Sequence, residues 1–245
     1  FDEEKVRKAT SAYFGLCSFL DHNIGIVLSA LENSEFSDET NIIYTSDHGD
    51  ALGMRGMWGK STMFEESAGV PMIIKGPNVP KSKKSKTPVS LVDIFPTVID
   101  SLKLVENPID NNLPGMSLLK ISNEKDDYER IVLSEYHAAA SPVGAFMLRK
   151  GKYKYVYFAE GYSSQLFNLE EDQYEENDLA LDLNYKAILK DFYGHLIKIC
   201  DPEEVNKRAK TEQLETIEKH GGVETIMGRG DFGYSPAPGQ KPEFD

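Results

Sequence analysis

One short segment of the sequence combines residue types that can bind a divalent cation. Asp47 and His48 are adjacent in the run Thr45-Ser46-Asp47-His48-Gly49-Asp50. A carboxylate beside an imidazole offers one hard oxygen and one borderline nitrogen as ligands. The pair directly follows a predicted buried strand, and in open α/β sheets ligands bind beyond the carboxyl ends of strands. Two ligands do not complete a metal site, and the residues alone equally allow Asp47 to cap a turn and His48 to lie exposed.

Other polar residues offer less specific signals. Lys60 lies in a glycine-rich loop, where a solvated lysine is the ordinary interpretation. His137 follows a predicted strand and is a candidate substrate contact, although a structural hydrogen bond is the more common explanation for a lone histidine beside a tyrosine. Arg149, Lys152 and Lys154 could attract an anionic substrate, but a solvated strand face is the more common explanation for them.

The elements that must position these residues are predicted from periodicity. Apolar residues recur every three or four positions over residues 2–31, which predicts a long amphipathic helix. The short apolar runs 41–46 and 70–75 are typical of strands covered on both faces. Asp93 is predicted to cap a helix that continues to Leu102. A helix that leads into a buried strand indicates an α/β fold.

The character of the chain changes near residue 122. Beyond a charged linker, we expect a small antiparallel sheet and then two helices, the second capped by Asp201 and closed by Gly221-Gly222. The glycine- and proline-rich tail 230–245 is expected to run extended. We therefore predict an α/β unit at 1–122, which carries the metal edge, and an α+β subdomain with its tail at 123–245. The predicted strands of the subdomain are 131–135, 144–149, 153–158 and 165–169.

Composition and charge limit the classes of partner. The 245 residues are 40% apolar and 10% aromatic, enough for a sizeable core. Lys and Arg number 27 against 40 Asp and Glu, a net charge of −13, which repels nucleic-acid phosphates and anionic lipid. No apolar run reaches the roughly 18–20 residues of a membrane span. We therefore expect neither a nucleic acid nor a membrane as a partner.

The two cysteines and the first residue of the chain do not indicate one cellular compartment. Cys17 and Cys200 form neither a disulfide framework nor a Cys-x-x-Cys pair, which leaves a soluble protein of the cytoplasm or the periplasm equally open. The chain begins at Phe1 without a recognisable signal peptide. We therefore expect it to be an internal part of a longer protein.

Seven short motifs occur in a fixed order along the chain, and this order is more specific than any one of the motifs alone. They are Ser46-Asp47-His48-Gly49 after a strand, Trp58-Gly59-Lys60, Phe64-Glu65-Glu66-Ser67, Val70-Pro71, Val92-Asp93-Ile94-Phe95-Pro96-Thr97, Pro114-Gly115-Met116-Ser117-Leu118, and the run from Gln165 to Glu175. Together they resemble the carboxyl-terminal half of the sulfatase family, in the alkaline phosphatase superfamily. The resemblance covers nearly the whole chain. It implies part of a mainly parallel, alkaline-phosphatase-like sheet with flanking helices.

The resemblance also implies roles for the matched residues. In sulfatases the counterpart of Asp47 ligates a divalent metal, and the next residue is a neighbouring ligand or a sulfate contact, so Asp47 and His48 are expected to serve the metal. Lys60 matches the lysine that binds a sulfate oxygen. Lys60 and His48 are therefore the expected catalytic residues, and Lys60 and His137 the expected substrate contacts. Calcium is the expected ion, with magnesium and manganese as alternatives.

The nucleophile of the family is missing from this chain. Sulfatases use a formylglycine made from a Cys/Ser-x-Pro-x-Arg motif, and neither Cys17 nor Cys200 begins one. The resemblance thus implies a metal-dependent hydrolase of sulfate monoesters, of which this chain holds half an active site and is inactive alone. Formylglycine is expected in the missing N-terminal half of the same protein. The expected partners are that N-terminal half and a small sulfated substrate. Association with a second copy of the protein is left open.

Two other functions remain open from the sequence. Phosphonate monoester and phosphodiester hydrolases resemble sulfatases in the same segments and use the same metal edge. A non-catalytic lobe that binds anions or a partner chain is the alternative from another class.

Overall fold

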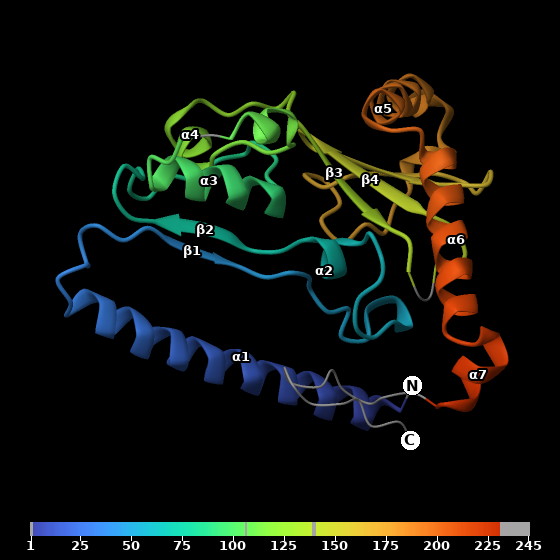
Figure 1. Ribbon diagram of the computed structural model, residues 1–245, viewed down its shortest axis with the longest axis horizontal. Coiled ribbons are helices and arrows are strands. Elements are labelled where there is room, and N and C mark those ends of the chain that lie inside the picture. Colours follow the sequence, from blue (N-terminus) through green and yellow to red (C-terminus); the bar gives the residue numbers. More distant parts are fainter. Residues whose placement is uncertain (1, 106, 139–140, 231–245) are drawn as a thin grey trace.

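A computed structural model describes residues 2–105, 107–138 and 141–230 (Figure 1). The extended tail predicted for 230–245 lies, apart from Gly230, outside these residues. Most predicted helices and strands are confirmed to within a few positions. The helices are α1 Glu3–Glu32, α2 Glu65–Ala68, α3 Ile94–Ser101, α4 Leu118–Asn123, α5 Lys186–Ile199, α6 Pro202–Lys219 and α7 Gly222–Gly228, and the strands are β1 Ile42–Thr45, β2 Met72–Lys75, β3 Ile131–Tyr136, β4 Ala145–Lys150, β5 Tyr153–Phe158 and β6 Gln165–Asn168.

The mainly parallel sheet expected from the sequence is not confirmed, because β1 and β2 pair antiparallel with Ile42 opposite Lys75. The reason lies in the connection between the two strands, which folds out and back on itself. The Gly49 N–H donates to the Ser67 carbonyl at 2.9 Å. The chain therefore enters β2 beside the point where it left β1, which gives antiparallel neighbours.

The two strands and α1 expose apolar surface that the sequence predicts to be buried. Tyr44 of β1 is 39% exposed and Ile73 of β2 is 59% exposed. No described residue of α1 is buried, although its apolar periodicity is confirmed as a helix of 30 residues. In Figure 1, α1 runs along the β1 side of the small sheet. One face of this layer is thus open in the described chain.

α1 is also long and apolar enough, by length and composition alone, to cross a membrane. The expectation that the chain contains no membrane-spanning segment is therefore not confirmed for this helix. Asp21, His22 and Asn23 lie near the middle of the helix. One helix of this kind is weak evidence for a membrane, since core helices of soluble proteins and signal sequences meet the same criterion.

The second sheet is fully antiparallel, in the order β3-β4-β5-β6, as predicted. Side chains alternate between its two faces. One face forms the main core with α5 and the start of α6, where Phe146 and Leu148 pack against Phe192 and Leu196. On the other face Ala145, Met147 and Val156 pack against Met63, which belongs to the loop before α2. This face therefore lies against the segment that carries Asp47 and His48.

Of the two predicted ends of α6, the start is confirmed and the end is confirmed in part. Asp201 caps α6 as predicted, accepting hydrogen bonds from the N–H groups of Glu203 and Glu204 at 3.0 and 3.1 Å. Gly221, at φ 97°, ends this helical segment, but Gly222 already begins α7. The predicted pair of closing glycines is thus divided between two helices.

Asp93 stands at the N-cap position of α3 as predicted, but its side chain makes no capping hydrogen bond to this helix. Its fully buried carboxylate accepts hydrogen bonds from Ser90 and Met116 N–H groups, both at 2.8 Å, and from both terminal nitrogens of Arg130 at 2.6 and 3.0 Å. A buried charge requires such partners. Asp93 therefore joins the start of α3 to the segment that leads into β3.

Replacement of Asp93 by alanine is expected to lower the free energy of unfolding by about 3–5 kcal/mol, because Arg130 would remain charged and largely buried without its partner. The measurement is chemical denaturation of the whole protein. Glu32→Ala is the control, since Glu32 and Lys75 form an exposed pair at 3.7 Å that contributes at most about 1 kcal/mol. Equal losses in the two variants would contradict the structural role of Asp93.

Candidate functional site

A cavity of about 640 Å³ lies between the end of β1 and the face of β3 and β4. Asp47, His48 and Lys60 line one side of it, so three of the four residues predicted for the site come together. The opposite side is made by the second sheet. Its lining there comprises Val132, Leu133, Ser134, Glu135, Tyr136, Met147 and Arg149.

Asp47 presents one free carboxylate oxygen. Its Oδ1 accepts hydrogen bonds from the His48 backbone N–H at 3.0 Å and the Ser46 hydroxyl at 3.3 Å. The hydrogen bond from the His48 N–H is the main reason that the pKa of Asp47 is lowered from its ordinary value. The carboxylate is therefore ionised at neutral pH, and Oδ2 remains available to a ligand.

The His48 ring is oriented by the backbone. Its Nδ1 lies 2.8 Å from the Gly49 carbonyl oxygen, which can only accept, so Nδ1 carries the proton in this contact. Nε2 then carries a lone pair, which accepts a hydrogen bond from the Lys60 ammonium. It lies 2.8 Å from the Lys60 Nζ and 3.5 Å from Asp47 Oδ2. A nitrogen ligand oriented through its other ring nitrogen is the usual arrangement at metal sites.

The same segment is held in place by its neighbours. A Cβ atom on Gly49 would lie 2.1 Å from the Glu66 carbonyl oxygen, so the chain approaches α2 as closely as a backbone can. Asp50 accepts hydrogen bonds from Leu52 N–H at 2.9 Å and Gly59 N–H at 3.2 Å, which fixes the loop that ends at Lys60. Sequence reasoning missed this role of Asp50, although its position in the motif was visible.

A buried ion cluster anchors α2 to the second sheet. The Lys154 ammonium lies 2.8 Å from Glu175 Oε1 and 3.0 Å from Glu65 Oε1, and the side chains of Lys154 and Glu175 are fully buried. Glu175 also accepts a hydrogen bond from the Glu65 N–H at 2.6 Å. Burial raises the pKa of Glu175, against the opposing effect of Lys154. The solvated strand face inferred for Lys154 is therefore wrong, because a partner distant in the sequence neutralises it.

His137 is not placed with the other predicted residues. It does not line the cavity, whereas Glu135 and Tyr136 do. Its ring packs edge-on against Phe146 at 5.2 Å, and neither ring nitrogen has a hydrogen-bond partner in the described chain, although the Glu135 carboxylate is 3.6 Å away. The structural hydrogen bond considered from the sequence is therefore not found either.

The donors at the cavity fit part of a metal site. Asp47 Oδ2 and His48 Nε2 converge at 3.5 Å, with a carboxylate and an imidazole as the donor groups. Within the described ranges no group of three or more His, Cys, Asp or Glu side chains could hold a metal ion. The remaining ligands of a complete site would therefore have to come from elsewhere.

Comparison with known protein families gives two overlapping matches. The profile of the family "Sulfatase" matches residues 1–104, and that of "N-sulphoglucosamine sulphohydrolase, C-terminal" matches residues 53–202.

Two relatives are similar to most of this chain, but the similar region makes up less than half of each relative's own length. A choline-sulfatase of Rhizobium meliloti is 40% identical over 73% of this chain and 34% of its own length. An arylsulfatase K of Danio rerio is 33% identical over 84% of this chain and 40% of its own length. The chain thus spans between a third and two fifths of these relatives.

Solved structures agree on the fold. A 2-O GAG sulfatase superposes with a TM-score of 0.72 at 25% identity, over 86% of this chain and 45% of its own. The phosphonate monoester hydrolase of Agrobacterium radiobacter superposes with a TM-score of 0.64 at 29% identity, over 76% of this chain and 40% of its own.

Replacement of Gly49 by alanine is expected to lower the free energy of unfolding by about 1–3 kcal/mol, because the new methyl group would overlap the Glu66 carbonyl and force the backbone apart. Denaturant unfolding of the whole protein measures the loss. In α5, Gly194→Ala is the matched control, since a methyl group there meets nothing within 4 Å and should stabilise the helix by about 0.5–1 kcal/mol. A Gly49→Ala protein as stable as the control would show that the close approach is unimportant.

Proposed function

The chain belongs to the sulfatase family, and from this premise we propose that the whole protein hydrolyses sulfate monoesters with the help of a divalent metal ion. The observation that carries the proposal is the convergence of Asp47 Oδ2, His48 Nε2 and Lys60 Nζ at the cavity beyond β1. This chain would contribute one side of the active site. Formylglycine, supplied by the rest of the protein, is the proposed nucleophile.

Asp47 and His48 are proposed to hold the metal ion. Calcium is the proposed ion and magnesium or manganese are alternatives, since Asp47 supplies a hard, ionised oxygen. A bound cation there would neutralise charge on the sulfate oxygens. Two hydrogen bonds within this chain orient the two donors. The His48 backbone N–H donates to the Asp47 carboxylate, and the His48 ring donates from Nδ1 to the Gly49 carbonyl.

Lys60 is proposed to bind a sulfate oxygen and so to act in both substrate binding and catalysis. Its ammonium already donates to His48 Nε2 at 2.8 Å and therefore stands beside the metal donors. A compact charge at this point can stabilise negative charge that develops on the sulfate and its leaving oxygen. Substrate contact by His137 is not part of the proposal, because His137 does not line the cavity.

The open face of the first layer fits an incomplete chain. The exposed residues Tyr44 and Ile73 and the apolar face of α1 are proposed to pack against the remainder of the protein, whose strands would extend the small sheet in parallel. The division into units at 1–122 and 123–245 is kept as part of this proposal. Neither a nucleic acid nor a membrane is proposed as a partner, and self-association remains open.

Phosphonate monoester or phosphodiester hydrolysis is the second candidate, favoured by the similarity to the Agrobacterium radiobacter hydrolase. The test compares kcat/KM of the whole protein for an aryl sulfate and for the matching aryl phosphodiester and phosphonate monoester. A clear preference for the sulfate supports the sulfatase proposal. A large preference for either phosphorus ester overturns it, and no turnover of any ester favours a non-catalytic lobe.

Asp47→Ala in the whole protein is expected to weaken metal binding and to reduce turnover by at least about 100-fold, because one ionised ligand is lost. Metal content after dialysis and initial rates measure the two effects. Asp126→Ala is the control: Asp126 likewise accepts a backbone N–H and a serine hydroxyl, at 2.9 and 3.0 Å, but does not line the cavity. Unchanged turnover of Asp47→Ala at saturating metal would refute the assignment.

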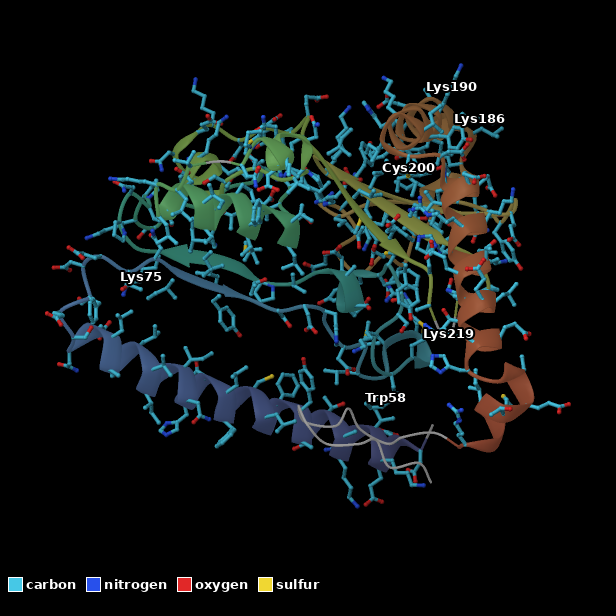
Figure 2. The ribbon with its side chains drawn as sticks, in the orientation of Figure 1. Trp58, Lys75, Lys186, Lys190, Cys200 and Lys219 are labelled. Carbon is cyan, nitrogen blue, oxygen red and sulfur yellow. The ribbon has the colours of Figure 1, made fainter. Side chains whose placement is uncertain are left out.

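Lys60→Ala is expected to lower kcat by about 100- to 1,000-fold, the usual effect of removing one group that stabilises developing negative charge. Stability should change little, since Lys60 is an exposed loop residue. The control is Lys75→Ala, at the end of β2 away from the cavity (Figure 2). If kcat of Lys60→Ala matches that of this control, Lys60 does not act in the reaction.

A further inference from the structure

The cavity contains a cationic side chain that the proposed reaction does not use. We propose that Arg149 binds a second anionic group of the substrate, a carboxylate or a further sulfate, so that the preferred substrate carries two negative groups. The inference rests on the proposed function and adds to it the class of sulfate ester that this cavity selects.

Arg149 belongs to a different wall of the cavity from the metal donors. It lies on β4, whereas Asp47, His48 and Lys60 follow β1 along the chain. The apolar side chain of Met147, two residues before it on the same face of the strand, lines the same wall. A cavity of about 640 Å³ has room for a substrate much larger than one sulfate group. Two separate anionic groups can therefore be bound on two walls.

The guanidinium of Arg149 has no partner of its own. Its Nη1 atom is buried without a hydrogen-bond partner, and no carboxylate forms an ion pair with it within 4 Å in the described chain. Two other cationic side chains, Arg130 and Lys154, differ from it. Arg130 is paired with Asp93, and Lys154 with Glu65 and Glu175. A buried N–H group without an acceptor costs free energy, which a ligand oxygen would recover.

The neighbouring carboxylates do not satisfy Arg149 because they are already committed. Arg149 and Lys154 stand directly opposite each other on β4 and β5, on one face of the sheet. Lys154 takes the contacts to Glu65 and Glu175, so these acidic groups act on Arg149 only at longer range. Burial lowers the pKa of Arg149, but an arginine remains charged in proteins. The cavity therefore keeps one cation available to a ligand.

The chemistry of arginine specifies the ligand. Its planar fork of N–H donors matches the two oxygens of a carboxylate or a sulfate, and it binds them more directionally than lysine does. A neutral or cationic group at this position would leave the guanidinium desolvated and unpaired. The second group of the substrate is therefore anionic, and an ester with a cationic group there would be selected against.

The test measures kcat/KM of the whole protein for phenyl sulfate and for phenyl sulfates that carry a carboxylate at the 3- or 4-position of the ring. The wild-type protein is expected to prefer a carboxylated ester. Arg149→Met should reduce kcat/KM for that ester by about 10- to 100-fold, the effect of losing a hydrogen bond to a charged group, and change the phenyl sulfate value by less than about threefold. Arg149→Lys should recover part of the loss.

Lys152→Met is the matched control. It removes one positive charge from the same hairpin, but Lys152 lies outside the cavity and pairs with Glu171 at 3.8 Å. It is expected to leave the preference between the two esters unchanged. An equal loss of the preference in Lys152→Met would assign the effect to overall charge and overturn the role of Arg149.

A binding measurement keeps the inference testable if Arg149→Met does not fold. Calorimetry on the wild-type protein compares benzenesulfonate with 3- and 4-sulfobenzoate, and tighter binding of a dianion by at least about tenfold is expected. Equal affinities would overturn the inference, as would equal losses for both esters in Arg149→Met. If the wild-type protein hydrolyses phenyl sulfate without these differences, the sulfatase proposal stands and only the role of Arg149 fails. If it hydrolyses no sulfate ester, both fail.

Discussion

The buried ammonium group of Lys154 places the strongest constraint on the arrangement of this chain. A cation without solvent must be paired, and its partners Glu65 and Glu175 come from segments far from it in the sequence. Pairing with Glu65 places α2 against the second sheet. Because α2 in turn touches Gly49 without space for a side chain, Asp47 and His48, which precede Gly49, are positioned relative to the sheet. A single desolvated charge thus determines where one wall of the cavity lies relative to the other.

The second sheet has two different functions on its two faces. One face buries Phe146 and Leu148 against α5 and forms the main core of this part of the chain. The other carries apolar side chains near Met63 and two opposed cations, Lys154 and Arg149. Because only one of these cations has carboxylate partners nearby, the same strand pair supplies both a structural ion cluster and an unpaired group in the cavity. Stability and specificity therefore depend on adjacent positions of one sheet face.

How far the sequence could predict the site depends on the distance between the residues concerned. Asp47 and His48 are covalent neighbours at the end of a strand, so their proximity is assured by the chain itself, and the family resemblance supplied Lys60. His137 was included because it follows a strand, yet it packs on Phe146 and away from the cavity. For Arg149 the sequence favours a solvated position, because the alternation of side chains along a strand does not indicate which face of the sheet packs against another part of the protein.

The sequence by itself determined most of the helices and strands, their limits to within a few residues, and the acidic and imidazole pair after β1, since periodicity, capping and covalent adjacency are local properties. The short helices α4 and α7 were not among them. Only the tertiary structure decided that β1 and β2 run antiparallel, that the Asp93 carboxylate binds Arg130, and that Lys154 is buried while Arg149 is unpaired. These outcomes depend on contacts between residues dozens of positions apart. Such contacts are selected by packing and by the need to pair every buried charge, which no local pattern expresses.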